Sequence, residues 1–255
     1  MSKPTDFPLL ILVMSFVMLW LSTQFGAHVI SKHRKLEEEI RDDFGAILAA
    51  TLTLLGLIIG FSFAMAIGRY DQRKNYEAAE ANAIGTEYAR ADLLPAADAA
   101  KVRALLVGYL DQRVLFYTTR DEQQIRQINA RTAQLQSELW AAVLAPAAAK
   151  PTPITALAVW GMNDVLNSQA YTQAAWWNRI PTAAWVLMAV IALCCTTLAG
   201  YSARNAKSER FLLLVLPLVV SISFFLIADI DSPRGGVIRV LPQNLASLAE
   251  SLRAH

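Results

Sequence analysis

The sequence has 255 residues, of which 55% are apolar and only 17% are charged. A soluble domain carries about 25% charged residues, so this composition argues against an ordinary soluble protein. The net charge is +2 and the basic and acidic residues interleave, which leaves no basic stripe for a nucleic acid. Cys194 and Cys195 are adjacent and the chain has only 3 histidines, so we expect no disulfide, no metal site and no cofactor.

Four blocks of the chain contain no Asp, Glu, Lys or Arg. They run from Phe7 to about Ala27, from Phe44 to Gly68, from Ile180 to about Ala203, and from Phe211 to Ala228. Crossing a hydrocarbon core roughly 30 Å thick takes about 20 helical residues, and buried helices of soluble proteins rarely stay charge-free for so long. We therefore predict an all-α integral membrane protein with four spans, placed in the cell membrane, and expect the first block to be retained rather than cleaved.

Four spans put both termini on the same side of the membrane as the long polar region. The short connectors 28–43 and 204–210 then lie on the other side, and the basic residues on the two sides balance. Charge alone therefore does not set the orientation. The predicted organisation has spans one and two with a basic connector, a helical extramembrane region, spans three and four, and a tail packing on that region. These parts cover residues 1–68, 69–179, 180–228 and 229–255.

The polar region is rich in Ala, Gln, Leu, Arg and Glu and poor in Gly, a composition that favours helices. Proline removes a backbone donor and clashes with the preceding turn, so Pro95 and the group at 146–153 mark interruptions. The predicted helices cover 70–93, 97–119, 122–145 and 154–175. Trp176, Trp177 and Trp185, around the start of span three, are predicted to anchor the chain at the membrane interface.

Small residues recur every four positions in the second span. A ridge of this kind lets two helix backbones approach closely in lipid; its members are Gly56, Gly60, Ala64 and Gly68. The neighbouring row of Leu57, Phe61 and Met65 lies about 100° around the helix. In a ring of subunits this row would face a central axis and form an apolar constriction, although periodicity alone favours side chains that face lipid or core.

Charged and polar residues follow the second span directly. Arg69, Arg73 and Glu77 are one turn apart, which supports a helix continuing out of the membrane. These side chains are either solvated or joined in Arg–carboxylate pairs that fix the geometry of crowded helices. Ions on such a path could be selected by hydroxyl groups such as that of Ser62, within the second span, or by charges at the mouths. The candidate charges are Arg69, Asp71, Asp229 and Asp231.

At these residues the sequence resembles the bestrophin-like membrane family. The resemblance rests on residues 60–94, where a glycine-rich span precedes an Arg, a Glu-Ala-Asn segment and a Tyr-x-Arg, and on residues 231–240, which are similar to the family's Asp-x-Pro-Phe-x-Gly-x-Ile-x-Val stretch. The motif positions, taken together as a charge network, are Arg69, Asp71, Arg73, Glu80, Asn82, Tyr88, Arg90, Asp229 and Asp231.

This resemblance implies a pentameric ion channel with a cytoplasmic helical region and a hydrophobic neck on the second span. The Tyr-Asp-x-Arg run of bacterial bestrophins matches Tyr70, Asp71 and Arg73, which carries the neck onto Leu57, Phe61 and Met65. The sequence departs from the family at Arg234, where the family has Phe. The acidic cluster that binds calcium in animal bestrophins is not visible either, which leaves no basis for calcium control.

Two functions compete on this evidence. The first is an oligomeric channel, assembled with copies of itself in the bilayer, that conducts inorganic ions passively. The alternative is a non-conducting membrane scaffold or signalling protein, because the helical region with balanced charge offers a docking surface. An enzyme is disfavoured, since the sequence has no G-x-S-x-G, Walker or H-E-x-x-H motif and the polar region gathers no acid, base and nucleophile.

Overall fold

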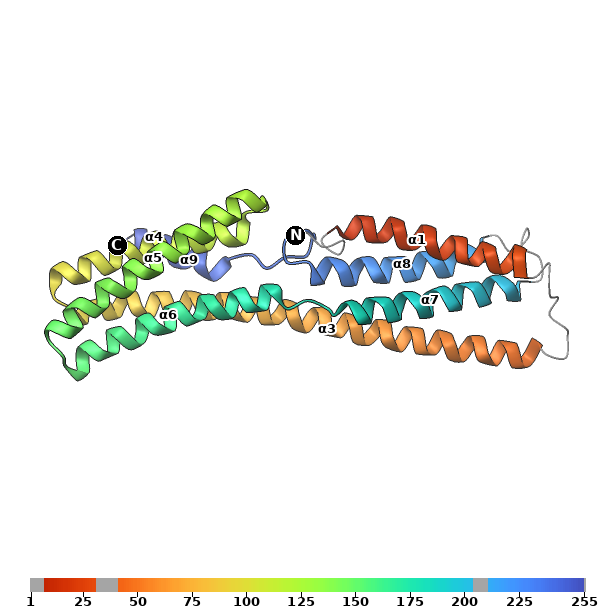
Figure 1. Ribbon diagram of the computed structural model, residues 1–255, viewed down its shortest axis with the longest axis horizontal. Coiled ribbons are helices and arrows are strands. Elements are labelled where there is room, and N and C mark those ends of the chain that lie inside the picture. Colours follow the sequence, from red (N-terminus) through yellow and green to blue (C-terminus); the bar gives the residue numbers. More distant parts are fainter. Residues whose placement is uncertain (1–6, 31–40, 204–210, 255) are drawn as a thin grey trace. The chain divides into compact units, whose positions relative to one another are not determined.

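The computed structural model describes residues 7–30, 41–203 and 211–254, and the described residues form helices and no strand (Figure 1). Most of both predicted connectors, with their basic residues, lies outside this part of the chain. The chain divides into a membrane unit, Met1–Tyr70 with Arg179–Arg239, and an extramembrane unit, Asp71–Asn178 with Val240–His255. Helix α3, Arg41–Arg90, contributes its first part to one unit and its second part to the other.

The four predicted spans are confirmed as helices long and apolar enough to cross a membrane. Each predicted block coincides with an observed helix. These helices are α1 (Pro8–Gln24) with the π-helical turn η2 (Phe25–Ile30), the first part of α3, α7 (Thr182–Ser202) and α8 (Leu212–Asp231). Inside each helix the backbone groups bond to one another, which is what lipid requires of a spanning segment.

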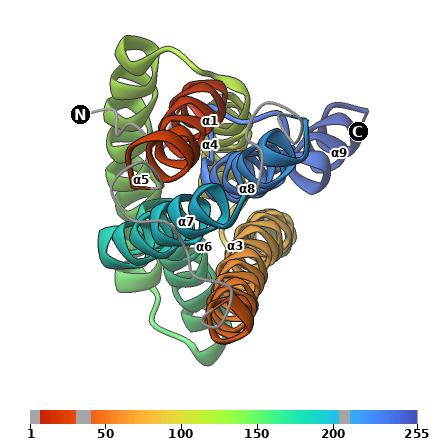
Figure 2. The same ribbon diagram turned by 90° about the vertical axis from the view of Figure 1, so that its right-hand side faces the viewer.

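The core of the membrane unit lies between α7, α8 and one face of α3. Leu55 and Ala66 of α3 pack there with Met188, Ala192 and Ile227, all of them buried. Viewed end-on, α1 and α3 lie on opposite sides of the α7–α8 pair (Figure 2). Helix α3 is therefore held to its own chain along one narrow face.

Helix α1 meets α7 through very small residues. A Cβ added to Gly200 would lie 2.1 Å from the Thr23 carbonyl oxygen, and one added to Gly26 would lie 2.1 Å from that of Thr197. The Ser22 and Thr197 hydroxyls hydrogen-bond at 2.6 Å across the same crossing. Close backbone approach and hydroxyl bonding are the two usual ways of joining helices in lipid.

The extramembrane unit contains the second part of α3 and four more helices. They are α4 (Ala96–Thr118), α5 (Glu122–Ala149), α6 (Pro153–Trp177) and α9 (Gln243–Arg253), and the short turn η4 (Ala91–Leu93) leads from α3 to α4. These bounds confirm the predicted helices, except that α5 continues through Pro146 to Ala149. Pro146 is buried in the packed unit, and this burial outweighs the hydrogen bond that the proline removes. The break falls at the next prolines, where Thr152 and Thr155 form a capping box.

The prediction of an interfacial anchor is wrong for Trp176. This side chain is only 6% exposed, and its ring packs 4.8 Å from Phe116 and 5.3 Å from Tyr117 in the extramembrane core. Edge-on and tilted contacts among these three buried rings add to the stabilisation that burial gives, and they account for the position of Trp176. Trp177 is exposed, and Trp185 packs edge-on against Phe224 in the membrane unit.

The close crossing of α1 and α7 predicts a strong effect of Gly200→Ala. The added methyl group meets backbone atoms that cannot rotate away, so we expect a loss of about 1–3 kcal/mol in stability. Thermal unfolding of the purified protein in detergent measures this loss as a lower midpoint. Gly45→Ala is the matched control, because its Cβ meets nothing within 4 Å; equal midpoints for the two variants would contradict the prediction.

Candidate functional site

The membrane part of α3 presents an apolar row that its own chain leaves uncovered. Leu57, Phe61 and Met65 are 53%, 64% and 41% exposed. Ser62, about 100° around the helix from Phe61, is buried against the rest of the chain, so its hydroxyl does not line the uncovered apolar row. Within the most apolar stretch of this helix only 6% of the residues are buried, against 44% in the corresponding stretch of α8. Among the described spans, α3 therefore depends least on its own chain for cover.

The small-residue ridge is uncovered as well. Its four members, Gly56, Gly60, Ala64 and Gly68, are all exposed, and a Cβ on any of the three glycines would meet nothing within 4 Å. The ridge therefore does not serve packing inside the chain, unlike Gly26 and Gly200, which do. A helix without backbone crowding gains nothing from glycine, since each one costs up to about 1 kcal/mol relative to alanine. The ridge therefore has no close helix partner within the described chain.

The charged residues at the end of the membrane unit form a buried cluster on Asp231. This carboxylate accepts from Arg179 Nε at 2.9 Å and from the Ile180 backbone N–H at 3.1 Å, and Arg69 Nη1 lies 3.9 Å away. Two guanidinium groups thus surround one carboxylate that is almost inaccessible to solvent. The cluster fixes the start of α7 against the end of α8.

The Asp229 carboxylate is likewise hydrogen-bonded within its own chain. Its two carboxylate oxygens accept the backbone N–H groups of Val237 and Ile238, each at 2.8 Å. These bonds hold the turn after α8, which is the second stretch on which the family resemblance rests. Neither Asp229 nor Asp231 is therefore an open charge at a mouth, whereas Asp71 is exposed.

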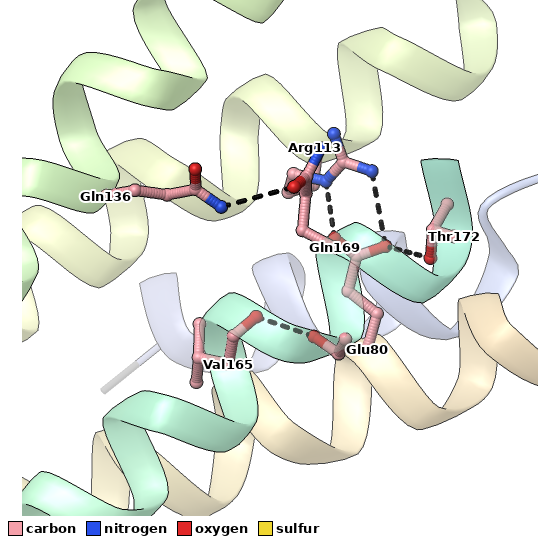
Figure 3. A network of polar contacts seen from close by, with 7 residues as sticks. Glu80, Arg113, Gln136, Val165, Gln169 and Thr172 are labelled. Atoms are coloured by element: carbon pink, nitrogen blue, oxygen red, sulfur yellow. Dashed lines mark hydrogen bonds and ion pairs between the residues drawn. The ribbon is translucent and has the colours of Figure 1, made fainter. Parts of the chain in front are cut away.

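Glu80 lies at the centre of a buried polar network in the extramembrane unit (Figure 3). It forms an ion pair with Arg113 of α4, and both side chains are inaccessible to solvent. Thr172 of α6 donates its hydroxyl to Glu80 Oε2 at 3.1 Å, and the guanidinium carbon of Arg113 lies 4.5 Å from the centre of the Phe116 ring. Three helices, α3, α4 and α6, are joined by this one carboxylate.

A second carboxylate on α3 holds the C-terminal helix. Glu77 accepts from Asn244 Nδ2 at 2.6 Å and from the Leu245 backbone N–H at 2.9 Å, at the start of α9. Arg73 is also buried, so the pairing alternative describes these positions better than solvation does. Each acidic side chain on this face of α3 meets a different part of the chain.

The residues of the predicted charge network differ in burial and in the partners they contact. Asp71 and Asn82 are exposed, and Tyr88 and Arg90 are half-buried. The Arg103 guanidinium lies over the Tyr88 ring, 5.2 Å from its centre. The part of the chain that the structure describes contains no group of three or more His, Cys, Asp or Glu side chains placed to hold a metal ion.

The sequence did not identify Arg113, and it left Glu87 as either a solvated charge or a partner of an arginine. Arg113 lies on the same helical face as Val102, Leu106 and Tyr109, all buried, so an arginine in an otherwise apolar stripe was an available signal. Nothing in its sequence neighbourhood distinguishes Glu87 from a solvated charge, yet it is completely buried.

Breaking the Glu80–Arg113 pair should strongly destabilise the extramembrane unit. Glu80→Gln leaves a buried guanidinium without its counter-charge, which costs about 3–5 kcal/mol. Thermal unfolding in detergent measures the loss, and the double variant Glu80→Gln, Arg113→Met should recover part of it because no charge then remains buried. A single variant that unfolds at the wild-type midpoint would contradict this assignment.

Removing the Asp229 carboxylate should release the turn at 232–240. Asp229→Ala leaves the backbone N–H groups of Val237 and Ile238 without their carboxylate acceptor. Both residues are exposed, at 83% and 40%, so water replaces part of each bond and the loss is about 0.5–1.5 kcal/mol per bond. Amide hydrogen exchange at Val237 and Ile238 should accelerate, with Asp229→Asn intermediate because it keeps one oxygen. Unchanged exchange in Asp229→Ala would show that other contacts hold the turn.

Comparison with known proteins agrees with this architecture. The family model of the bestrophin-like domain matches residues 10–245, while no curated protein sequence matches the chain. A crystal structure of a bacterial bestrophin homologue from Klebsiella pneumoniae has a TM-score of 0.62 at 14% identity and covers 94% of this chain and 95% of that chain. A single-substitution variant of that homologue gives 0.65 at 13% identity, covering 95% and 96%.

A crystal structure described as a membrane protein gives a TM-score of 0.66 at 12% identity, with 95% of this chain and 97% of that chain covered. At such identities the structures show a shared fold. The family model spans almost all of the described residues and confirms the resemblance seen at residues 60–94 and 231–240. The chain therefore belongs to the bestrophin-like family.

Proposed function

We propose that the protein is a homo-oligomeric channel for passive conduction of inorganic ions, with an apolar neck formed by Leu57, Phe61 and Met65. The observation that carries this proposal is the pair of uncovered rows on α3, one apolar and one of small residues. Lipid is a sufficient partner for apolar side chains. It gives no reason for open glycines every four residues, whereas a second helix backbone does.

The small-residue ridge and the apolar row lie on different faces of α3, and this arrangement suits a closed ring of subunits. If the ridge packs against the next copy, the apolar row about 100° away turns toward the axis of the ring. Residues 44–68 carry no charge, so ions would pass an apolar constriction, which gates by wetting and dewetting. Asp71, exposed just beyond this stretch, would be the first carboxylate met at the mouth.

The assembly and its placement extend the same proposal. We infer a pentamer in the cell membrane with the extramembrane unit in the cytoplasm, the arrangement that the resemblance to bestrophins implies. The residues that line the proposed path include no nucleophile, acid and base in one place, which supports transport rather than catalysis.

A non-conducting scaffold is the second candidate, and one observation favours it. Ile154, Leu157 and Trp160 on α6 are all at least half exposed at a spacing that puts them on one helix face. An apolar stripe of this kind outside the membrane is typical of a docking surface. Purified protein that binds a partner through this stripe, and has no conductance as a folded oligomer, would support the scaffold.

Phe61→Ala tests the neck directly. Removing the largest side chain of the row widens the constriction and makes it easier to wet, so single-channel conductance in planar bilayers should rise. Phe25→Ala is the matched control, because Phe25 is also exposed, at 53%, but lies on η2. It should leave conductance unchanged.

A rise with Phe61→Ala and no rise with Phe25→Ala supports the proposed path. If well-folded Phe61→Ala oligomers conduct as the wild type does, or if both variants change conductance alike, the neck assignment is wrong. Absence of any conductance in the wild type under several ionic conditions would contradict the channel itself.

A further inference from the structure

Glu87 lies in a part of the extramembrane unit that the proposed conduction does not use. Its side chain, on α3, is 0% exposed, and among the described residues neither carboxyl oxygen has a hydrogen-bond partner. Most buried carboxylates of this protein accept two or more hydrogen bonds, as Glu77 and Asp229 do. Glu87 is therefore an exception that calls for a physical explanation.

Gly161 on α6 has no side chain, and this leaves room for the Glu87 carboxyl group. A Cβ added to Gly161 would lie 2.0 Å from Glu87 Oε2 and 2.5 Å from Arg90 Nη1. The acid thus occupies a notch in α6 that only glycine leaves open. The notch brings α3 and α6 together at this carboxyl group.

Arg90 lies beside the same notch, yet among the described residues no hydrogen bond joins it to Glu87. Arg90, on α3 itself, is half-buried, and Asp164, on α6, is exposed and of the same sign as Glu87. On η4 and α4, Asp92 and Arg103 form an ion pair with each other. Burial is the largest effect and raises the pKa of Glu87 to about 8; Arg90 lowers it and Asp164 raises it further.

We propose that Glu87 is a proton-operated latch between α3 and α6: the neutral acid stays in the Gly161 notch, and the ionised form leaves it and opens the contact. An unpaired carboxylate without hydrogen bonds is costly inside a protein, so ionisation favours any conformation that returns it to water. Gly161 has no side chain that can move aside, so the exit of Glu87 requires α6 and α3 to separate locally. This inference goes beyond conduction and does not depend on it.

The sign of the pH dependence follows from the raised pKa. Between the ordinary value of 4.5 and about 8, the closed contact binds a proton that the open form has lost. Opening therefore becomes more favourable as the pH rises through this window and levels off above about 8. The upper limit is about tenfold in the opening equilibrium per pH unit, reached if Glu87 is fully hydrated when open.

Hydrogen exchange of the full-length protein in detergent tests the latch. The rates of the α6 amides around Gly161 are compared between wild type and Glu87→Gln at the same pH, so that the intrinsic pH effect cancels. The neutral amide cannot ionise, so the wild-type-to-variant ratio should rise steeply, by up to about tenfold per unit, between pH 6 and 8. A ratio that stays constant from pH 6 to pH 9 would overturn the proposal.

Two further variants show whether Glu87 is the group that titrates. Asp164→Asn removes a like charge and should lower the midpoint of the exchange transition, whereas Arg90→Gln removes an opposite charge and should raise it. Asp164 is exposed, so its substitution preserves folding. Shifts of the midpoint in opposite directions in the two variants support the latch. If the midpoint moves in neither variant, another group titrates and the latch proposal is overturned.

Discussion

The one-sided packing of α3 is the constraint on which the rest of the membrane unit depends. Leu55, Ser62 and Ala66 are buried against the chain, while the small-residue ridge and the row of Leu57, Phe61 and Met65 are uncovered. Lipid cannot drive helices together by the hydrophobic effect, so close helix contacts need shape, and small residues provide it. The protein uses this device inside the chain at Gly26 and Gly200, and the longer ridge on α3 is uncovered. In the proposed ring this ridge packs against the next copy.

Acidic side chains organise the extramembrane unit in a different way. Glu80 joins α3 to α4 and α6, Glu77 joins it to the start of α9, and Glu87 faces the glycine notch of α6. The first two are satisfied by charge or by hydrogen bonds and specify one packing of the helices. Glu87 is not satisfied, which is why a change of protonation has a structural consequence there and not at the other two. The same helix that carries the proposed neck thus also carries the fixed and the titratable contacts of its second part.

The sequence was sufficient for the family, the four spans and the helices within residues 69–179, but it did not predict α9 in the C-terminal tail. Charge-free blocks define the four spans, and proline and composition define the extramembrane helices to within a few residues. The exceptions are tertiary effects: burial keeps Pro146 inside α5 and draws Trp176 into the extramembrane core. The site was predictable only in part. Helical periodicity locates the two rows on α3, but it cannot tell that Asp229 and Asp231 are enclosed by their own chain, because their partners lie on other segments. Glu87 and Gly161 are 74 positions apart in the chain, and only the fold brings them together.

The structure of the assembled protein in a lipid nanodisc is the most direct test of the central claim, that α3 lines an axis shared by several copies. The account predicts a closed ring in which the glycines of each α3 touch the adjacent copy and Phe61 points toward the centre. An assembly with α3 on its outer perimeter, and Phe61 among the acyl chains, would contradict it.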